Sequence, residues 1–295
     1  MSFSNLNFLG LDEAGSGFEE AAVAVIPVPY ERTVSFRAGC SRGPLAIIQA
    51  SRSLELYDEE FELRPSDCGI HTAPELECDI SPESMTRTVR ETCLRAARAG
   101  KFVVTLGGEH SVTLGAFSAQ REIHPDVSVL SVDAHCDLRD SYQGSKFSHA
   151  CVMRRVLETG ARVTVAGARS MSSGEAEFAR GREGLTVIPA RETAGGGGEA
   201  VARVVESLGE RVYLSIDADG LDPALMPAVG TPEPGGFGWE EITALLSAVF
   251  ARREVVGMDF VELCPIDGMC APEVTAARLI QKAIGYKFGG RAAGI

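Results

Sequence analysis

Acidic side chains and histidines gather where several apolar, strand-like runs of the sequence end. Three such runs, FVVTLGG, VSVLSV and VYLSI, are followed within a few residues by side chains that could hold metal ions: His110, Asp133, His135, Asp137, Asp217 and Asp219. Unpaired carboxylates are costly to bury. The pattern therefore indicates either an opening to water or a positively charged group bound among these residues.

The spacing of these residues constrains the local backbone. Residues two apart on a strand share a face and lie about 6.6 Å apart, so Asp133 and Asp137 would be separated by about 13 Å in an extended chain. One small cluster could not use both carboxylates at that distance. We therefore expect the chain to leave the strand near His135 and to curl back at Asp137, whereas Asp217 and Asp219 have a spacing that suits two neighbouring ions.

The types of the candidate ligands favour one kind of metal. Four aspartates and two histidines form a set rich in oxygen and poor in nitrogen. Such a set suits Mn²⁺ better than structural zinc, which prefers cysteine and histidine, although Fe²⁺, Co²⁺ or Ni²⁺ would also bind. A single aspartate at a strand end is usually a helix N-cap, but three strand ends contribute here. Glu109, beside His110, is expected to act in the first turn of a helix and not as a ligand.

The elements that must position these side chains alternate along the chain. Short β-branched runs are each followed by a segment with helical periodicity, which is typical of a mainly parallel sheet covered on both faces. The expected strands are 22–28, 101–108, 127–135, 162–169, 185–190, 211–219 and 254–263. The expected helices are 43–57, 111–123, 150–158, 174–181, 199–209, 239–253 and 272–286.

Composition excludes several classes of function. The chain has 295 residues and 45% hydrophobic content, as in ordinary globular proteins. It carries 41 acidic against 28 basic residues, which argues against a nucleic-acid partner. No apolar run approaches the roughly 20 residues that a membrane span needs. The N-terminus lacks the pattern of a secretory signal, and the eight cysteines form no CxxC pair, so we expect a cytoplasmic protein with reduced thiols.

Taken together, the motifs resemble those of the ureohydrolases, the arginase and agmatinase family. The resemblance rests on GGEHS (107–111), DAHCD (133–137) and SIDADGLDP (215–223), in this order, and it extends over nearly the whole chain. It implies a single three-layer αβα domain spanning residues 1–295, with a mainly parallel sheet of about eight strands. Glu109 stands where the family usually has Asp, and the neighbouring His110 is intact.

The resemblance also implies a metal centre and two further site residues. Two Mn²⁺ ions per chain are expected, with Asp133 and Asp217 bridging them; His110 and Asp137 would complete one site, and His135 and Asp219 the other. Such a pair of ions activates water for attack on the carbon of a guanidinium group. His149 matches the family's general acid/base, and Glu262 matches the carboxylate that holds the guanidinium through paired hydrogen bonds.

The identity of the guanidine is expected from the loop after DAHCD. Arginases carry an Asn there that helps to bind the amino-acid end of arginine, whereas this chain has Leu138 and Arg139. The loop is more similar to that of agmatinases, so the resemblance implies hydrolysis of agmatine to putrescine and urea. Arg139 would repel the ammonium group of agmatine if it pointed inward. We therefore expect Arg139 to face away from the substrate and to pair with an acid such as Asp140.

Other functions remain open at this point. The substrate could be guanidinobutyrate, guanidinopropionate, arginine or formiminoglutamate. A zinc deacetylase of the same fold class would be expected to lack the second metal set, which is complete here. A non-catalytic metal-binding member of the family would not need all catalytic positions to be filled. The family commonly forms trimers or hexamers, so a homo-oligomer is expected.

Overall fold

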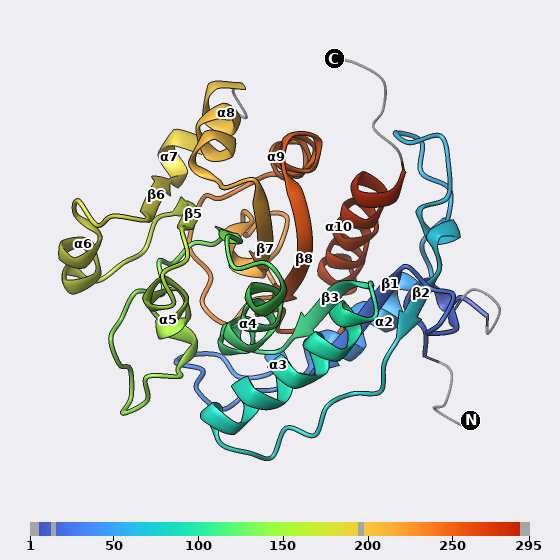
Figure 1. Cartoon of the computed structure of the whole chain (residues 1–295), viewed down its shortest axis with the longest axis horizontal. Coiled ribbons are helices and arrows are strands. Elements are labelled where there is room, and N and C mark those ends of the chain that lie inside the picture. The colour runs from blue at the N-terminus through green and yellow to red at the C-terminus, as the bar shows by residue number, and fades with distance from the viewer. Residues whose placement is uncertain (1–5, 13–15, 194–197, 290–295) are drawn as a thin grey trace.

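A parallel β-sheet with helices on both faces forms the framework of the molecule (Figure 1). The structure is a computed structural model, and it describes residues 6–12, 16–193 and 198–289. The strands in these ranges are β1 (Val23–Val28), β2 (Ile70–Thr72), β3 (Phe102–Gly107), β4 (Ser128–Val132), β5 (Val163–Ala168), β6 (Leu185–Pro189), β7 (Arg211–Asp217) and β8 (Glu254–Val261). The prediction of about eight strands is confirmed, and every strand pairing in these ranges is parallel.

The strand order places the expected site residues next to one another. The order across the sheet is β2-β1-β3-β8-β7-β4-β5-β6. Of the four central strands, β3, β7 and β4 are followed by, or end in, the candidate metal ligands, and β8 is followed by Glu262. Because the strands are parallel, their carboxyl ends meet at one edge, which is where ligands bind in open α/β sheets.

Helices cover the two faces of the sheet. They are α2 (Gly43–Ser51), α3 (Pro82–Arg98), α4 (Thr113–Ile123), α5 (Val152–Glu158), α6 (Ser173–Ala179), α7 (Ala190–Thr193), α8 (Gly198–Ser207), α9 (Trp239–Arg252) and α10 (Ala271–Phe288). Residues of α2, α8, α9 and α10 share one apolar core with the sheet, and residues of α3, α4 and α5 share the other. The predicted three-layer αβα architecture is confirmed.

Strand β1 illustrates how the sequence builds both cores. Val23 and Val25 belong to the core under α2 and α10, whereas Ala24, Ile26 and Val28 belong to the core under α3 and α4. Successive strand side chains point to opposite faces, so a strand buried on both faces must be apolar at every position. This explains why β1 appears in the sequence as an unbroken apolar run.

Some elements differ from the sequence prediction. The sequence prediction did not include α3, the short helix α7 or the short edge strand β2. The helix predicted for 43–57 ends at Ser51. The Ser51 hydroxyl donates to the carbonyl of Ile48 at 2.7 Å and accepts from the amide of Leu9 at 2.8 Å. That hydroxyl therefore joins the end of α2 to the N-terminal segment.

Candidate metal centre and active site

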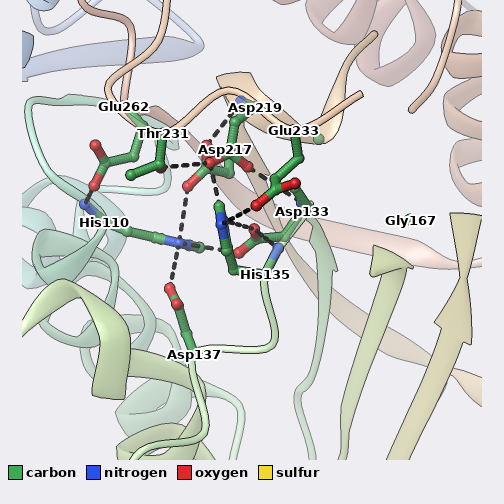
Figure 2. Close-up of polar contacts among 12 residues, drawn as sticks. His110, Asp133, His135, Asp137, Gly167, Asp217, Asp219, Thr231, Glu233 and Glu262 are labelled. Carbon is green, nitrogen blue, oxygen red and sulfur yellow. Dashed lines mark hydrogen bonds and ion pairs between the residues drawn. The ribbon is translucent and has the colours of Figure 1, made fainter. Parts of the chain in front are cut away.

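The first group of candidate ligands surrounds the ring of His110. Two residues, Gly108 and Glu109, separate His110 from the end of β3. Its Nδ1 lies 3.3 Å from Asp133 Oδ2, 3.0 Å from Asp137 Oδ2 and 3.2 Å from Asp217 Oδ2 (Figure 2). His110 Nδ1 and Asp133 Oδ2 are buried, yet neither makes a hydrogen bond. Buried polar atoms are rarely left unpaired, so these atoms fit a bound cation better than they fit one another.

A second group lies beside the first and shares Asp133 with it. His135 Nδ1 is 3.0 Å from Asp219 Oδ2 and 3.7 Å from Asp133 Oδ1. Ligand atoms of Asp133, His135 and Asp219 all lie within 4.8 Å of one another, as do those of His110, Asp133 and Asp137. The structure therefore brings all six sequence-predicted ligands together, with Asp133 common to both groups.

The backbone takes left-handed conformations at two of the predicted site residues. The φ angle is 51° at Asp137 and 62° at Glu262. The left-handed backbone at Asp137 produces the turn that the spacing of Asp133 and Asp137 required. It brings Asp137 Oδ2 to 3.0 Å from His110 Nδ1. Left-handed residues other than glycine store strain and cluster at functional sites.

The electrostatics of the cluster favour a bound cation. Burial and the neighbouring charge of Asp137 raise the pKa of Asp133 to about 7. Burial, together with Asp219 and Asp133, also raises the pKa of Asp217 well above its usual range. Burial lowers the pKa of His135, but the hydrogen bond and charge of Asp219 outweigh it and bring that pKa to about 11. Divalent cations would relieve this crowding of negative charge.

Side chains behind the ligands hold them in place. His110 Nε2 lies 3.0 Å from the hydroxyl of Ser215, which donates to Asp259 at 2.7 Å. Tyr213 donates to the other oxygen of Asp259, also at 2.7 Å. Metal-binding histidines commonly use their second nitrogen in this way, which fixes the ring orientation. The link from Asp259 to His110 through Ser215 depends on the pairing of β7 with β8, which places Ser215 opposite Asp259.

His149 and Glu262, the two predicted residues for substrate chemistry, face one another. His149 begins a short 3-10 helix before α5, and its Nδ1 lies 3.4 Å from Glu262 Oε1. The same oxygen accepts the backbone amide of His110 at 2.7 Å. Burial lowers the pKa of His149, but the hydrogen bond and charge of Glu262 outweigh burial and raise this pKa to about 9.

Glu109 has a different role from the expected one. Its side chain makes no capping bond to the short helix that follows. Instead the buried carboxylate accepts from the backbone amides of Arg32 and Thr33 and from the Thr33 hydroxyl, each at 2.6 Å, and from Ser111 at 2.5 Å. The expectation of helix first-turn chemistry was wrong, because these donors occupy both oxygens. The Thr33 hydroxyl also accepts the backbone amide of His149 at 2.9 Å.

A cavity of about 290 Å³ opens onto this cluster. Its lining includes site residues, namely His135, Asp137, Asp217, Asp219 and Glu262, and also Ser35, Tyr142, Ser170, Met171 and Ser172. A wider groove of about 920 Å³ around Asp126 and Arg162 has no histidine in its lining. Volume alone would therefore not have identified the site.

Arg139 also lines the cavity, which corrects the expectation that it faces away. It does pair with an acid, as expected, but the partner is Glu175, whose Oε2 lies 3.7 Å from Arg139 Nε. Asp140, the expected partner, accepts from Arg155 at 2.8 Å.

Comparisons with known proteins agree with this geometry. The family model described as "Arginase family" matches residues 21–285. The N(1)-aminopropylagmatine ureohydrolase of Thermus thermophilus is 45% identical over 280 residues, which cover 93% of each chain. The agmatinase of Pyrococcus horikoshii is 35% identical, over 90% of this chain and 92% of the relative.

A solved structure extends the similarity to the fold. The agmatine ureohydrolase of Thermoplasma volcanium superposes with a TM-score of 0.88 and is 32% identical, covering 100% of this chain and 98% of the other. The match over nearly the full length leaves the deacetylase alternative without support. The chain belongs to the arginase family of ureohydrolases, as the resemblance of its motifs implies.

Proposed function

We propose that this ureohydrolase cleaves the guanidino group of agmatine or of an N-alkylated agmatine, and that it releases urea and a polyamine. The observation that carries the proposal is that two candidate metal groups lie together with Glu262 and His149 at one cavity. A non-catalytic role would not require this complete set.

The six ligands fit two divalent cations. We assign His110, Asp133, Asp137 and Asp217 to one ion, and Asp133, His135, Asp217 and Asp219 to the other. The unpaired atoms of His110 and Asp133 and the crowded carboxylates support the assignment. The oxygen-rich donor set supports Mn²⁺ as the metal.

Glu262 and His149 take complementary parts in the reaction. Two Mn²⁺ ions held by the six ligands would lower the pKa of water and stabilise negative charge. Glu262 is buried, with 5% of its surface exposed. Its carboxylate can accept hydrogen bonds from the N–H groups of the guanidinium and so hold the substrate in one orientation. The Glu262 carboxylate, 3.4 Å from His149 Nδ1, favours the protonated imidazole, so His149 can donate a proton to the amine as the C–N bond breaks.

The choice among guanidines rests on the far end of the substrate. The relatives at 45% and 35% identity are named for aminopropylagmatine and agmatine, which both carry a cationic tail. No carboxylate-binding pair of basic groups lines the described part of the cavity, because Arg139 is its one Arg or Lys and lies beside Glu175. Both observations favour a cationic tail over the carboxylate of guanidinobutyrate or arginine.

A substrate panel tests the proposal. Full-length protein is dialysed, loaded with Mn²⁺ and assayed for urea from agmatine, N1-aminopropylagmatine, arginine, guanidinobutyrate and guanidinopropionate, and for formamide from formiminoglutamate. We expect the highest kcat/KM for one of the two agmatines. A preference for a guanidino acid would refute the assignment of substrate, and absence of both products from every compound would refute the hydrolase.

Cellular setting and assembly are also part of the proposal. All eight cysteines are free thiols, which supports a reducing, cytoplasmic location. None of the helices in the described ranges combines the length and apolar character that crossing a membrane needs. A trimer or hexamer stays a prediction from the family, to be checked by light scattering after gel filtration.

A further inference from the structure

Glu175 holds a fixed carboxylate in the lining of the cavity. It lies in the first turn of α6 and is 6% exposed. Its Oε1 accepts the backbone amide of Leu138 at 3.0 Å, and its Oε2 accepts the amide and the hydroxyl of Ser172 at 2.9 and 2.7 Å. The Ser172 hydroxyl in turn accepts the amide of Glu175 at 3.3 Å, which completes a capping box. The bond from Leu138 joins α6 to the loop that follows the metal ligands.

Arg139 lies against this carboxylate. Its Nε is 3.7 Å from Glu175 Oε2, and its guanidinium carbon is 5.0 Å from the centre of the Tyr142 ring. The side chain is 39% exposed and lines the cavity. Among the described lining residues, Arg139 and Glu175 are the only formally charged ones apart from the proposed metal ligands, His149 and Glu262.

We propose that Glu175 is a specificity-determining positioning residue, which neutralises Arg139 so that the cavity accepts guanidines with a cationic tail. The inference rests on the proposed function and names the class of substrate: aliphatic guanidines that end in an ammonium group. Without the charge of Glu175, Arg139 would present an uncompensated cation to the tail. The same site would then disfavour ammonium and favour carboxylate.

The expected effect is large enough to measure. Two unit charges about 6 Å apart change a binding constant by about threefold even when water screens them fully, and by more where the screening is weaker. Because the change has opposite sign for an ammonium and for a carboxylate, the ratio of their kcat/KM values shifts by about tenfold or more. Arg139 is partly exposed, so the effect should weaken as salt is added.

The experiment compares matched substrates across matched variants. Agmatine, 4-guanidinobutyrate and the neutral butylguanidine are assayed with Mn²⁺-loaded wild type, Glu175→Gln, Arg139→Gln and the double variant. Gln suits the same position of a capping box, so α6 should still form. Butylguanidine has no tail charge, and its kcat/KM reports any loss that is merely structural.

We expect the agmatine to guanidinobutyrate ratio to fall about tenfold in Glu175→Gln and to rise in Arg139→Gln. In the double variant the effect of Glu175→Gln should disappear. An unchanged ratio in Glu175→Gln, or a fall of the same size in the Arg139→Gln background, would overturn the inference, since Glu175 would then not act through Arg139. Failure of the wild type on every guanidine would instead refute the proposed function itself.

Discussion

Replacing Thr33 by Val would test the hydrogen-bonded link between the metal-binding edge and His149. The Thr33 hydroxyl donates to Glu109 and accepts from the backbone amide of His149. Thr33 is 9% exposed, and Val has nearly its shape. The substitution therefore removes two hydrogen bonds from a buried site and leaves the packing almost unchanged.

The expected cost follows from the two groups that lose a partner. A hydrogen bond to a charged acceptor contributes about 1.5–3 kcal/mol, and a buried amide without a partner costs about 1–3 kcal/mol. Glu109 keeps the two amides and Ser111 as donors, so we expect a net loss of about 2–5 kcal/mol. For a chain of this size each kcal/mol lowers Tm by about 2 °C, which gives a decrease of about 4–10 °C.

Turnover should fall together with stability. His149 begins its short helix at the amide that Thr33 accepts, so freeing this amide lets the imidazole drift from Glu262. A misplacement of about 1 Å can cost up to about 10²-fold in rate. We expect kcat to drop about tenfold or more while the bound metal, measured by elemental analysis, is unchanged.

Thr33→Ser is the matched control, because it keeps the hydroxyl and loses only a methyl group. It should retain most of the activity and most of the Tm. The reasoning fails if Thr33→Val has the Tm and kcat of the wild type, or if Thr33→Ser is equally damaging, since the methyl group and not the hydroxyl would then matter.

Three further predictions concern the metal, the proton and the pH range of stability. Asp133→Ala should impair both ion sites, and elemental analysis of saturated wild type should give two ions per chain, whereas one ion would refute a dinuclear centre. His149→Ala should lose about 10²–10⁴ in rate but keep its metal, and loss of metal would make His149 a ligand. Burial lowers the pKa of Lys282, but hydrogen bonds from its Nζ to Asp58 and Glu60 outweigh this and raise it above 10.5. The contribution of Lys282 to the free energy of unfolding is therefore present below about pH 10.4 and is lost as the pH rises through the pKa of the folded state. In Lys282→Met, the free energy of unfolding should not show this loss when it is measured across the alkaline range.

Much of the site could be predicted because the residues of each motif are close in sequence. A parallel sheet brings the carboxyl ends of its strands to one edge, whatever the order of the strands. The curl at Asp137 followed from distance alone, since no extended chain could return its carboxylate to Asp133. The position of Glu262 between His110 and Asp217 was not predictable in this way, because it depends on β8 lying between β3 and β7.

Helix α3 was missed because its apolar side is narrow. Its buried apolar residues, chiefly Met85, Val89 and Cys93, recur every four positions among charged neighbours. The capping pattern was nevertheless present, because Ser81 precedes Pro82 and its side chain accepts the amide of Ser84 at 3.3 Å. Strand β2 is only Ile70–Thr72 at the sheet edge, which is too short to show alternation.

The pairing of Arg139 illustrates what no local pattern contains. Asp140 is its neighbour in sequence, but Asp140 pairs with Arg155 of α5 while Arg139 faces the cavity. The true partner, Glu175, is supplied by the first turn of α6, after β5 has intervened. The reacting end of the substrate is therefore governed by residues within short motifs, whereas its far end is governed by a contact between distant segments. For this reason the motifs are enough to infer that a guanidine is cleaved. Which guanidine is preferred is tested by substituting Arg139 and Glu175.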